Sequence, residues 1–456
     1  MLLFAICTLG RGESLDESWF VKCTGMFIVC LALVPLLCEA SQKVLDPFNP
    51  RNLFLFSFSL QFGFYPLVIL AGGERLPLLN YAAESGIEKY YVYAQVLAVL
   101  GLISFLLGYS TRLAERMVRF LPSPRPLDIQ RAKRSIWILF IVGYLGMAVF
   151  LLKQGGLREF LNNREIWRAE GIPGSGLFLI SVDLWLPAAA LLPMILLTKC
   201  NEPWRKTGRR LGFLCICLIP VLFLGFRSLI IIPVLQGVAV LHYRRKRISV
   251  SAFVWVAVLL SVFMTVYGVS RSVHGNASEL LAAVGPQEAL DYVFFRSPGT
   301  DLVATILSNH PDRHFEYGLK GAIESATIVI PRGVWPGKPV SWGERFTTTF
   351  FGDYLYMTGI VQEVYGGVNC TAIGYFYLQC GWISVVIGMF LLGMGVKTIY
   401  SYGVRFAGSN TAFLLFILLW PVPLIMVDAP QNAFNQIVII LCCAWLPLFY
   451  FVRQRN

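Results

Sequence analysis

The sequence predicts an all-α, polytopic membrane protein of about eleven transmembrane helices with one long loop on the outer face. Of its 456 residues, 56% are hydrophobic and only 14% are charged, and the mean hydropathy is +0.65. Soluble domains carry about 25% charged residues, so a soluble enzyme is excluded, and this apolar content excludes a disordered chain. The net charge of +12 lies in short blocks between apolar runs. That placement is typical of membrane topology signals, and we expect no nucleic-acid partner.

Apolar runs follow one another along the whole chain, and a membrane helix needs about 20 such residues. Nine good candidates are 19–38, 52–73, 90–110, 135–152, 174–198, 249–269, 371–397, 409–427 and 432–452. The apolar stretch 211–243 is broken at Gly225-Phe226-Arg227 and predicts a hairpin of two helices. The opening run 1–9 is too short to span and has no small-residue cleavage site, so we expect it to be retained.

The positions of Lys and Arg predict which loops are cytoplasmic. The loop 112–134 has seven basic residues against two acidic ones, 199–210 has five against one, and 244–247 has four and no acid. With these three loops inside, the helices alternate only if 211–243 crosses twice, which places the N-terminus outside and the C-terminus inside. We therefore divide the chain into a transmembrane bundle (1–269, including the 211–243 hairpin), a large outer loop (270–370) and three C-terminal helices (371–456).

Arg227 is the most informative single residue. Each arm of the predicted hairpin, from Arg210 to Arg227 and from Arg227 to Arg244, covers about 25 Å of helix. The hydrocarbon core is about 30 Å thick, so the turn is expected just below the outer surface. A guanidinium there is costly unless it lines a wet cavity or meets an anion, which favours a functional role. The alternative is that Arg227 extends to the outer headgroups.

A second concentration of charge is the segment IPRGVWPGKP, residues 330–339. Three prolines in nine positions forbid a helix and leave a stiff, extended loop that can hold Arg332 and Lys338 beside Trp335. Paired cations bind diphosphate well, and an indole suits the apolar face of a sugar. The residues alone fit a rigid linker at the membrane interface equally well, with Trp335 as an anchor.

These segments resemble the Wzy-type O-antigen and exopolysaccharide repeat-unit polymerases. The resemblance is carried by IPRGVWPGKP (330–339), the helix opening TAIGYFYLQCGW (371–382), LGFRSLIII (224–232) and DPFNPRNLFLF (46–56). Arg332 and Gly343 also stand at the Arg-x10-Gly spacing of some members.

The resemblance implies an inverting, metal-independent glycosyltransferase of the GT-C type that uses no cofactor. Such enzymes work on the periplasmic face of the bacterial inner membrane. They move a growing glycan from one undecaprenyl diphosphate onto the non-reducing sugar of a new lipid-linked repeat unit. The implied partners are lipid-linked oligosaccharide, the bilayer, a chain-length regulator and a flippase.

The cationic residues fit this chemistry, because departure of a diphosphate places negative charge where preorganised cations help most. Arg227, Arg332 and Lys338 are expected to converge on the leaving group. Further substrate-binding candidates in the outer loop share a positive charge; they are Arg271, Arg296 and Arg345. A solvated loop surface is the alternative for these three.

Two carboxylates are candidates for the general base that activates the acceptor hydroxyl. Asp301 follows a turn and precedes a helical pattern, so it is either a base or a helix N-cap. Glu344 lies beside the cationic loop and is either a base tuned by its neighbours or an ion pair with Arg345.

Two other functions remain open. An O-antigen ligase shares the fold and the lipid donor but delivers the glycan to another acceptor. A lipid-linked oligosaccharide flippase or transporter predicts short loops on both faces and repeat-related halves, which the loop 270–370 disfavours.

Overall fold

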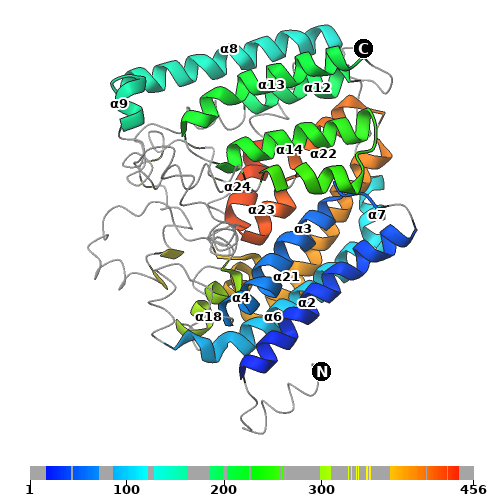
Figure 1. Ribbon diagram of the computed structural model, residues 1–456, viewed down its shortest axis with the longest axis vertical. Coiled ribbons are helices and arrows are strands. Elements are labelled where there is room, and N and C mark those ends of the chain that lie inside the picture. The colour runs from blue at the N-terminus through cyan, green and yellow to red at the C-terminus, as the bar shows by residue number, and fades with distance from the viewer. Residues whose placement is uncertain are drawn as a thin grey trace.

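The computed structural model describes residues 17–42, 45–70, 86–121, 128–162, 185–198, 203–224, 227–256, 258–260, 262, 298–309, 327, 330, 335, 337, 346–347, 349–350, 370–406, 408–428 and 430–440. Within them every regular element is a helix (Figure 1). The elements are α2 (Glu17–Ser41), α3 (Pro50–Phe58), the π-helix η1 (Ser59–Phe64), α4 (Tyr65–Leu70), the 3₁₀-helix η2 (Ile87–Tyr90), α6 (Tyr91–Ser110), α7 (Arg112–Phe120), α8 (Ile129–Lys153), α9 (Leu157–Asn162), α12 (Leu186–Leu197), α13 (Trp204–Leu224), α14 (Arg227–Arg244), α18 (Gly299–Asn309), α21 (Ala372–Arg405), α22 (Asn410–Leu419), α23 (Val422–Asp428) and α24 (Pro430–Ile439). The predicted all-α, polytopic class is confirmed.

Six helical segments in the described part of the chain are long and apolar enough to cross a membrane. They are Ser18–Ser41, Pro50–Leu70, Ile87–Ser110, Ile129–Lys153, Ala372–Arg405 and Asn410–Asp428. Leu186–Leu197 and Ile230–Arg244 are shorter apolar helices. All of these fall on predicted apolar runs, and the total of eleven spans stays a prediction.

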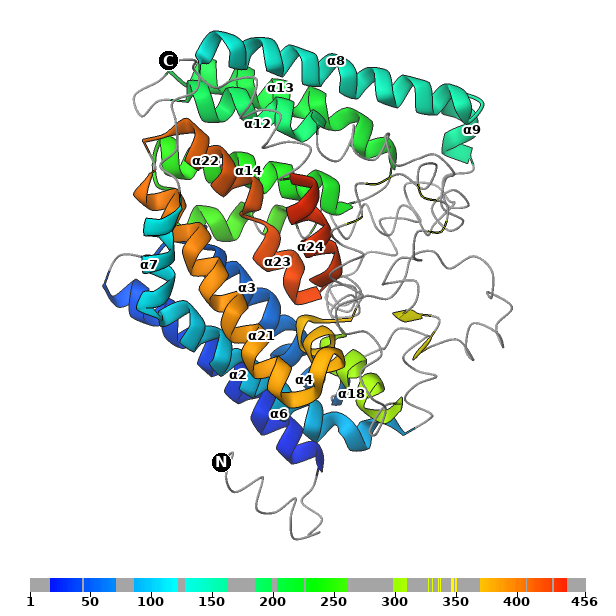
Figure 2. The same cartoon turned by 180° about the vertical axis from the view of Figure 1, so that it is seen from behind.

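The bundle has two hydrophobic cores (Figures 1 and 2). The first lies among α2, α3, η1, α6, α18 and α21. The second lies among α8, α12, α13, α14 and α22, with α8, α12 and α13 at the edge of the molecule farthest from α2. α23 and α24 lie between the two groups in both views.

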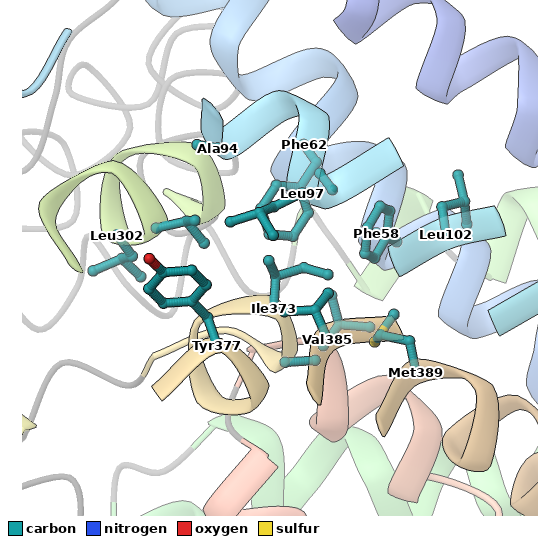
Figure 3. Packing of buried hydrophobic residues seen from close by; sticks show 14 of the residues in the cluster. Phe58, Phe62, Ala94, Leu97, Leu102, Leu302, Ile373, Tyr377, Val385 and Met389 are labelled. Carbon is teal, nitrogen blue, oxygen red and sulfur yellow. The ribbon is translucent and has the colours of Figure 1, made fainter. Parts of the chain in front are cut away.

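Small residues let α6 and α21 approach closely. A Cβ built on Gly108 would lie 2.0 Å from the carbonyl oxygen of Phe390, and one on Gly393 would lie 2.1 Å from that of Phe105. In lipid, helices associate by such backbone proximity and van der Waals packing rather than by a hydrophobic driving force. Figure 3 shows apolar side chains from both helices, with Ile373, Val385 and Met389 of α21 on the side that faces α6.

The basic segments meet at one end of the bundle. Arg245, just after α14, donates to the hydroxyl of Thr207 in α13 at 2.8 Å, and Arg244 donates to Asn410 at the start of α22 at 3.1 Å. Lys397 of α21 lies 3.6 Å from Glu115 of α7. We call this the basic end. α18 packs at the opposite end of α6, and we call that end of the bundle the α18 end.

Candidate functional site

Asp301 is the predicted site residue that the structure describes most fully. Its side chain is 0% exposed, and it lies in the first turn of α18. One carboxylate oxygen accepts a hydrogen bond of 2.6 Å from the hydroxyl of Tyr65 in α4. The other accepts a hydrogen bond from the hydroxyl of Tyr91, the first residue of α6. The N-cap interpretation is wrong, because α18 begins two residues earlier, at Gly299, and Asp301 joins three helices instead of capping one.

The π-helix η1 supplies backbone acceptors beside Asp301. The side-chain amide nitrogen Nε2 of Gln95 in α6 donates to the backbone carbonyl oxygen of Phe62 and to the hydroxyl of Thr300, both at 3.0 Å. The Thr300 hydroxyl lies 3.3 Å from the carbonyl oxygen of Gln61. π-turns inside α-helices are frequent at functional sites. Here the π-turn fixes the start of α18 against α6.

We call the contact of η1, α6 and the start of α18 around Asp301 the junction. Two further features show how closely it is packed and how polar it is. A Cβ on Gly299 would lie 2.7 Å from the Cβ of Gln61, so only glycine lets α18 approach η1 this closely. The side-chain oxygens of Gln61 and Gln95 are buried and have no hydrogen-bond partner among the described residues. Each buried acceptor without a partner lowers the folding stability by about 1–3 kcal/mol. These two oxygens therefore remain able to accept hydrogen bonds from a group outside the described residues.

The start of α21 closes the junction from the other side. The hydroxyl of Thr371 accepts from the backbone amide of Gly374 at 3.2 Å and caps this helix. A Cβ on Gly374 would lie 2.5 Å from Ile306 of α18. Figure 3 shows Leu302 of α18 beside Tyr377, with Ala94 and Leu97 of α6 nearby. A kink at Cys380 and Gly381, where Gly381 has φ of 67°, separates this first part of α21 from the rest.

Arg227 is the first residue of α14, and the structure describes its backbone but not its side chain. α14 has 18 residues, about 27 Å of helix, and Arg244 at its other end belongs to the basic end. Arg227 therefore lies at the end of α14 that points away from the basic end. The free backbone N–H groups of a helix's first turn carry partial positive charge, which favours an anion there.

The other predicted site residues are only thinly described. Trp335 is 37% exposed. Six other predicted site residues lie outside the described residues; they are Arg332, Lys338, Glu344, Arg271, Arg296 and Arg345. The convergence of cations on a diphosphate thus stays a prediction.

Sequence reasoning missed the polar groups around Asp301. Tyr65, Tyr91, Gln61 and Gln95 lie in or next to long apolar runs, where polar side chains are rare and often functional. The two glutamines inside membrane spans were the available signal. Within the described parts of the chain, no group of three or more His, Cys, Asp or Glu residues could hold a metal ion.

A second buried polar cluster occupies the basic end, around Asp46 of the segment DPFNPRN. Asp46 accepts hydrogen bonds from the hydroxyls of Tyr243 (2.8 Å) and Tyr400 (3.1 Å), and from the backbone amide of Phe48 (3.0 Å). Nε2 of His242 lies 3.3 Å from the same carboxylate, and its Nδ1 accepts from the amide of Ile248 at 2.9 Å. Burial opposes ionisation, but these hydrogen bonds outweigh it and hold the pKa of Asp46 below its ordinary value.

The Asp46 cluster continues into a salt bridge that ties three helices together. Arg51 of α3 lies 2.9 Å from Glu39 of α2, and its guanidinium stacks over Tyr109 of α6, 5.2 Å from the ring centre. Tyr109 donates to Asn49, the N-cap of α3, at 3.0 Å. Every polar group named here is engaged within the protein, so this cluster fixes helix positions rather than offering a binding site.

Comparison with known proteins gives one family. The model of the family described as "Putative O-antigen polymerase" matches residues 55–300, which is more than half of the chain. The matched range includes Arg227, Arg271 and Arg296 and ends at Thr300, directly before Asp301. No curated protein and no solved structure matches the chain.

Proposed function

The chain belongs to the O-antigen polymerase family, and from this membership we propose that it joins undecaprenyl-diphosphate-linked oligosaccharide repeat units into a polysaccharide. The family match over residues 55–300 carries the proposal. The polytopic helical fold supports it, because a lipid-linked substrate has to be reached from within the bilayer. We place the reaction at the periplasmic face of the bacterial inner membrane, with the α18 end outward. The positive-inside rule supports this orientation, since it places the opposite, basic end in the cytoplasm.

The proposed reaction is glycosyl transfer with inversion at the anomeric carbon. The acceptor hydroxyl attacks that carbon, its bond to the diphosphate oxygen breaks, and undecaprenyl diphosphate leaves with the bonding electrons. Arg227, Arg332 and Lys338 stabilise the charge that develops on the diphosphate. Arg227 supports this assignment in two ways, by its own charge and by its place at the positive end of α14.

The substrate contacts of the outer loop complete this proposal. Trp335 stacks on a sugar ring, and its exposed fraction of 37% leaves indole surface for such a contact. Arg271, Arg296 and Arg345 bind further anionic or hydroxyl groups of the lipid-linked substrate.

We assign the two carboxylates different roles. Asp301 already accepts hydrogen bonds from Tyr65 and Tyr91 and is fully buried, so an acceptor sugar would have to displace a tyrosine to reach it. We therefore propose that Asp301 is a positioning residue that holds α18 against α4 and α6. Glu344 is the general base of this proposal, since it is the candidate carboxylate that lies beside the cationic loop in the sequence.

The test is a reaction of the purified full-length protein in liposomes with one defined lipid-linked repeat unit. We expect a ladder of products on a gel without any further acceptor. A ligase would give no ladder until its acceptor is added, and a transporter would move labelled lipid across the bilayer without forming a glycosidic bond. Either result would overturn the proposal.

We call Arg227, Arg332 and Lys338 together the diphosphate clamp, and variants of this clamp sharpen the test. Arg227→Ala and Arg332→Ala should abolish the ladder while membrane abundance stays unchanged. Arg209→Ala removes the same charge from an exposed position on α13 near the basic end, and it should leave the ladder intact. Full-length polymer at normal rates from both clamp variants would show that the clamp is wrong.

A further inference from the structure

α7 divides its surface into three sectors. Ala114 and Val118, four residues apart, are buried. The carbonyl oxygen of Ala114 accepts from Thr398 of α21 at 3.5 Å, and Val118 packs with Tyr402 and Ala412. This sector faces the protein and fixes how the rest of the helix is presented.

The second sector is apolar and exposed. Leu113 is 50% exposed, Met117 is 42% exposed and Phe120 is 88% exposed. Their spacing of four and three residues places them on one stripe of the helix, to one side of the buried sector. No described part of the chain covers this stripe, and in water it would be unfavourable.

The third sector is basic and exposed. Arg112, Arg116 and Arg119 lie three or four residues apart on the side of the helix away from the protein contact. Glu115, the acid of this helix, lies 3.6 Å from Lys397 of α21, so its charge is balanced by a residue outside α7. The three arginines therefore present an excess of positive charge directly beside the apolar stripe.

The position of α7 puts these sectors at the level of the lipid headgroups. The span Ile87–Ser110 ends with α6. The next residue, Thr111, has an extended backbone with φ of −67° and ψ of 140°. Its hydroxyl donates to the carbonyl oxygen of Gly108 at 2.8 Å and so caps the last turn of α6. α7 then begins at the next residue, at the edge of the bundle in Figure 2.

We propose that α7 is an interfacial helix that binds anionic phospholipid, with headgroup phosphates on Arg112, Arg116 and Arg119 and acyl chains against Leu113 and Phe120. An interfacial helix combines an apolar face with a basic polar face. Charge complementarity selects an anionic over a zwitterionic headgroup, and arginine binds phosphate with two parallel hydrogen bonds. This proposal does not depend on the polymerase activity, because it uses only the membrane placement of the chain.

The test is lipid binding to the delipidated full-length protein in detergent, followed by native mass spectrometry. Wild type should bind phosphatidylglycerol in preference to phosphatidylcholine. Replacing Arg116 and Arg119 by Gln together should weaken phosphatidylglycerol binding by about fivefold for each arginine. Replacing both by Lys keeps the charge and should retain most of the preference.

A matched control removes the same charge elsewhere at the basic end. Lys133→Gln with Arg134→Gln, on the exposed side of α8, should change the phosphatidylglycerol affinity by less than about twofold, since only α7 is proposed to hold the lipid. An equal loss in this control and in the α7 variant would show unspecific charge attraction and overturn the proposal. An unchanged lipid affinity of the Arg116 and Arg119 double variant would also overturn the proposal. If that variant changed the oligomeric state while its lipid affinity stayed the same, α7 would instead be a contact between two copies of the chain.

Discussion

Replacing Gly393 by Ala tests the contact between α6 and α21 on which the first core depends. The added Cβ would lie 2.1 Å from the carbonyl oxygen of Phe105, whereas ordinary contacts of a Cβ begin near 3.4 Å. The backbone of Gly393 fixes the position of this Cβ, and the oxygen belongs to the backbone of α6, so neither atom can rotate away and the two helices must separate by about 1 Å. A gap of this size forfeits about a quarter to a half of the dispersion energy of the facing atoms.

The expected cost is at the upper end of the range for overpacked sites, about 2–3 kcal/mol of unfolding free energy. The chain offers a close control two residues along the same helix. A Cβ on Gly395 meets nothing within 4 Å, so Gly395→Ala should be neutral or stabilise by up to about 1 kcal/mol.

The assay is unfolding of the purified protein in mixed micelles by titration with sodium dodecyl sulfate, followed by far-ultraviolet circular dichroism. Gly393→Ala should unfold at a clearly lower detergent fraction than both wild type and Gly395→Ala. If the two alanine variants unfolded within about 0.5 kcal/mol of each other, the proposed backbone contact would be refuted.

Three further predictions concern the two polar clusters and the clamp. Tyr91→Phe removes a hydrogen bond to the buried carboxyl group of Asp301 and should lower the unfolding free energy by about 1–3 kcal/mol, measured in the same titration. A loss below about 0.5 kcal/mol would contradict it. Because the pKa of Asp46 is lowered in the folded protein, its stabilisation is present above its unfolded pKa of about 4 and is lost as the pH falls through the folded value. The stability difference between wild type and Asp46→Asn should accordingly shrink as the pH falls below about 4, and a difference that grew in acid would show the opposite sign. Lys338→Arg, which keeps the charge but changes its geometry, should reduce chain growth less than Lys338→Ala in the gel assay, and equal loss would argue against a simple point charge.

The membrane-spanning segments could be predicted because lipid imposes a requirement that each segment meets locally. The run 90–110 contains enough apolar residues to cross, and it forms the span Ile87–Ser110. Boundaries were less predictable. The run 135–152 became the longer helix Ile129–Lys153, because charged residues outside the lipid continue the helix from the N-cap Asp128. α7 lies in a segment read only as a basic loop, since its apolar stripe is too short to register as a span.

The site was partly predictable in its residues but not in its contacts. Asp301 was singled out from its local sequence, yet Tyr91 and Tyr65 lie 210 and 236 positions away from it. The same holds for Asp46, whose partner Tyr400 lies 354 positions away. The residues next to a buried carboxylate in the sequence do not indicate which side chain, hundreds of positions away, will form a hydrogen bond with it.

The sequence by itself predicted a multi-pass membrane protein, the positions of most apolar helices and the resemblance to the O-antigen polymerase family, since hydropathy, charge and motif are local properties. Only the tertiary structure decided which face of each helix meets which neighbour, because helices such as α6 are apolar over most of their surface and their hydrophobicity does not single out one face. That choice rests on glycines at Gly108 and Gly393 and on polar groups such as Asp301, which have to find partners where water is excluded.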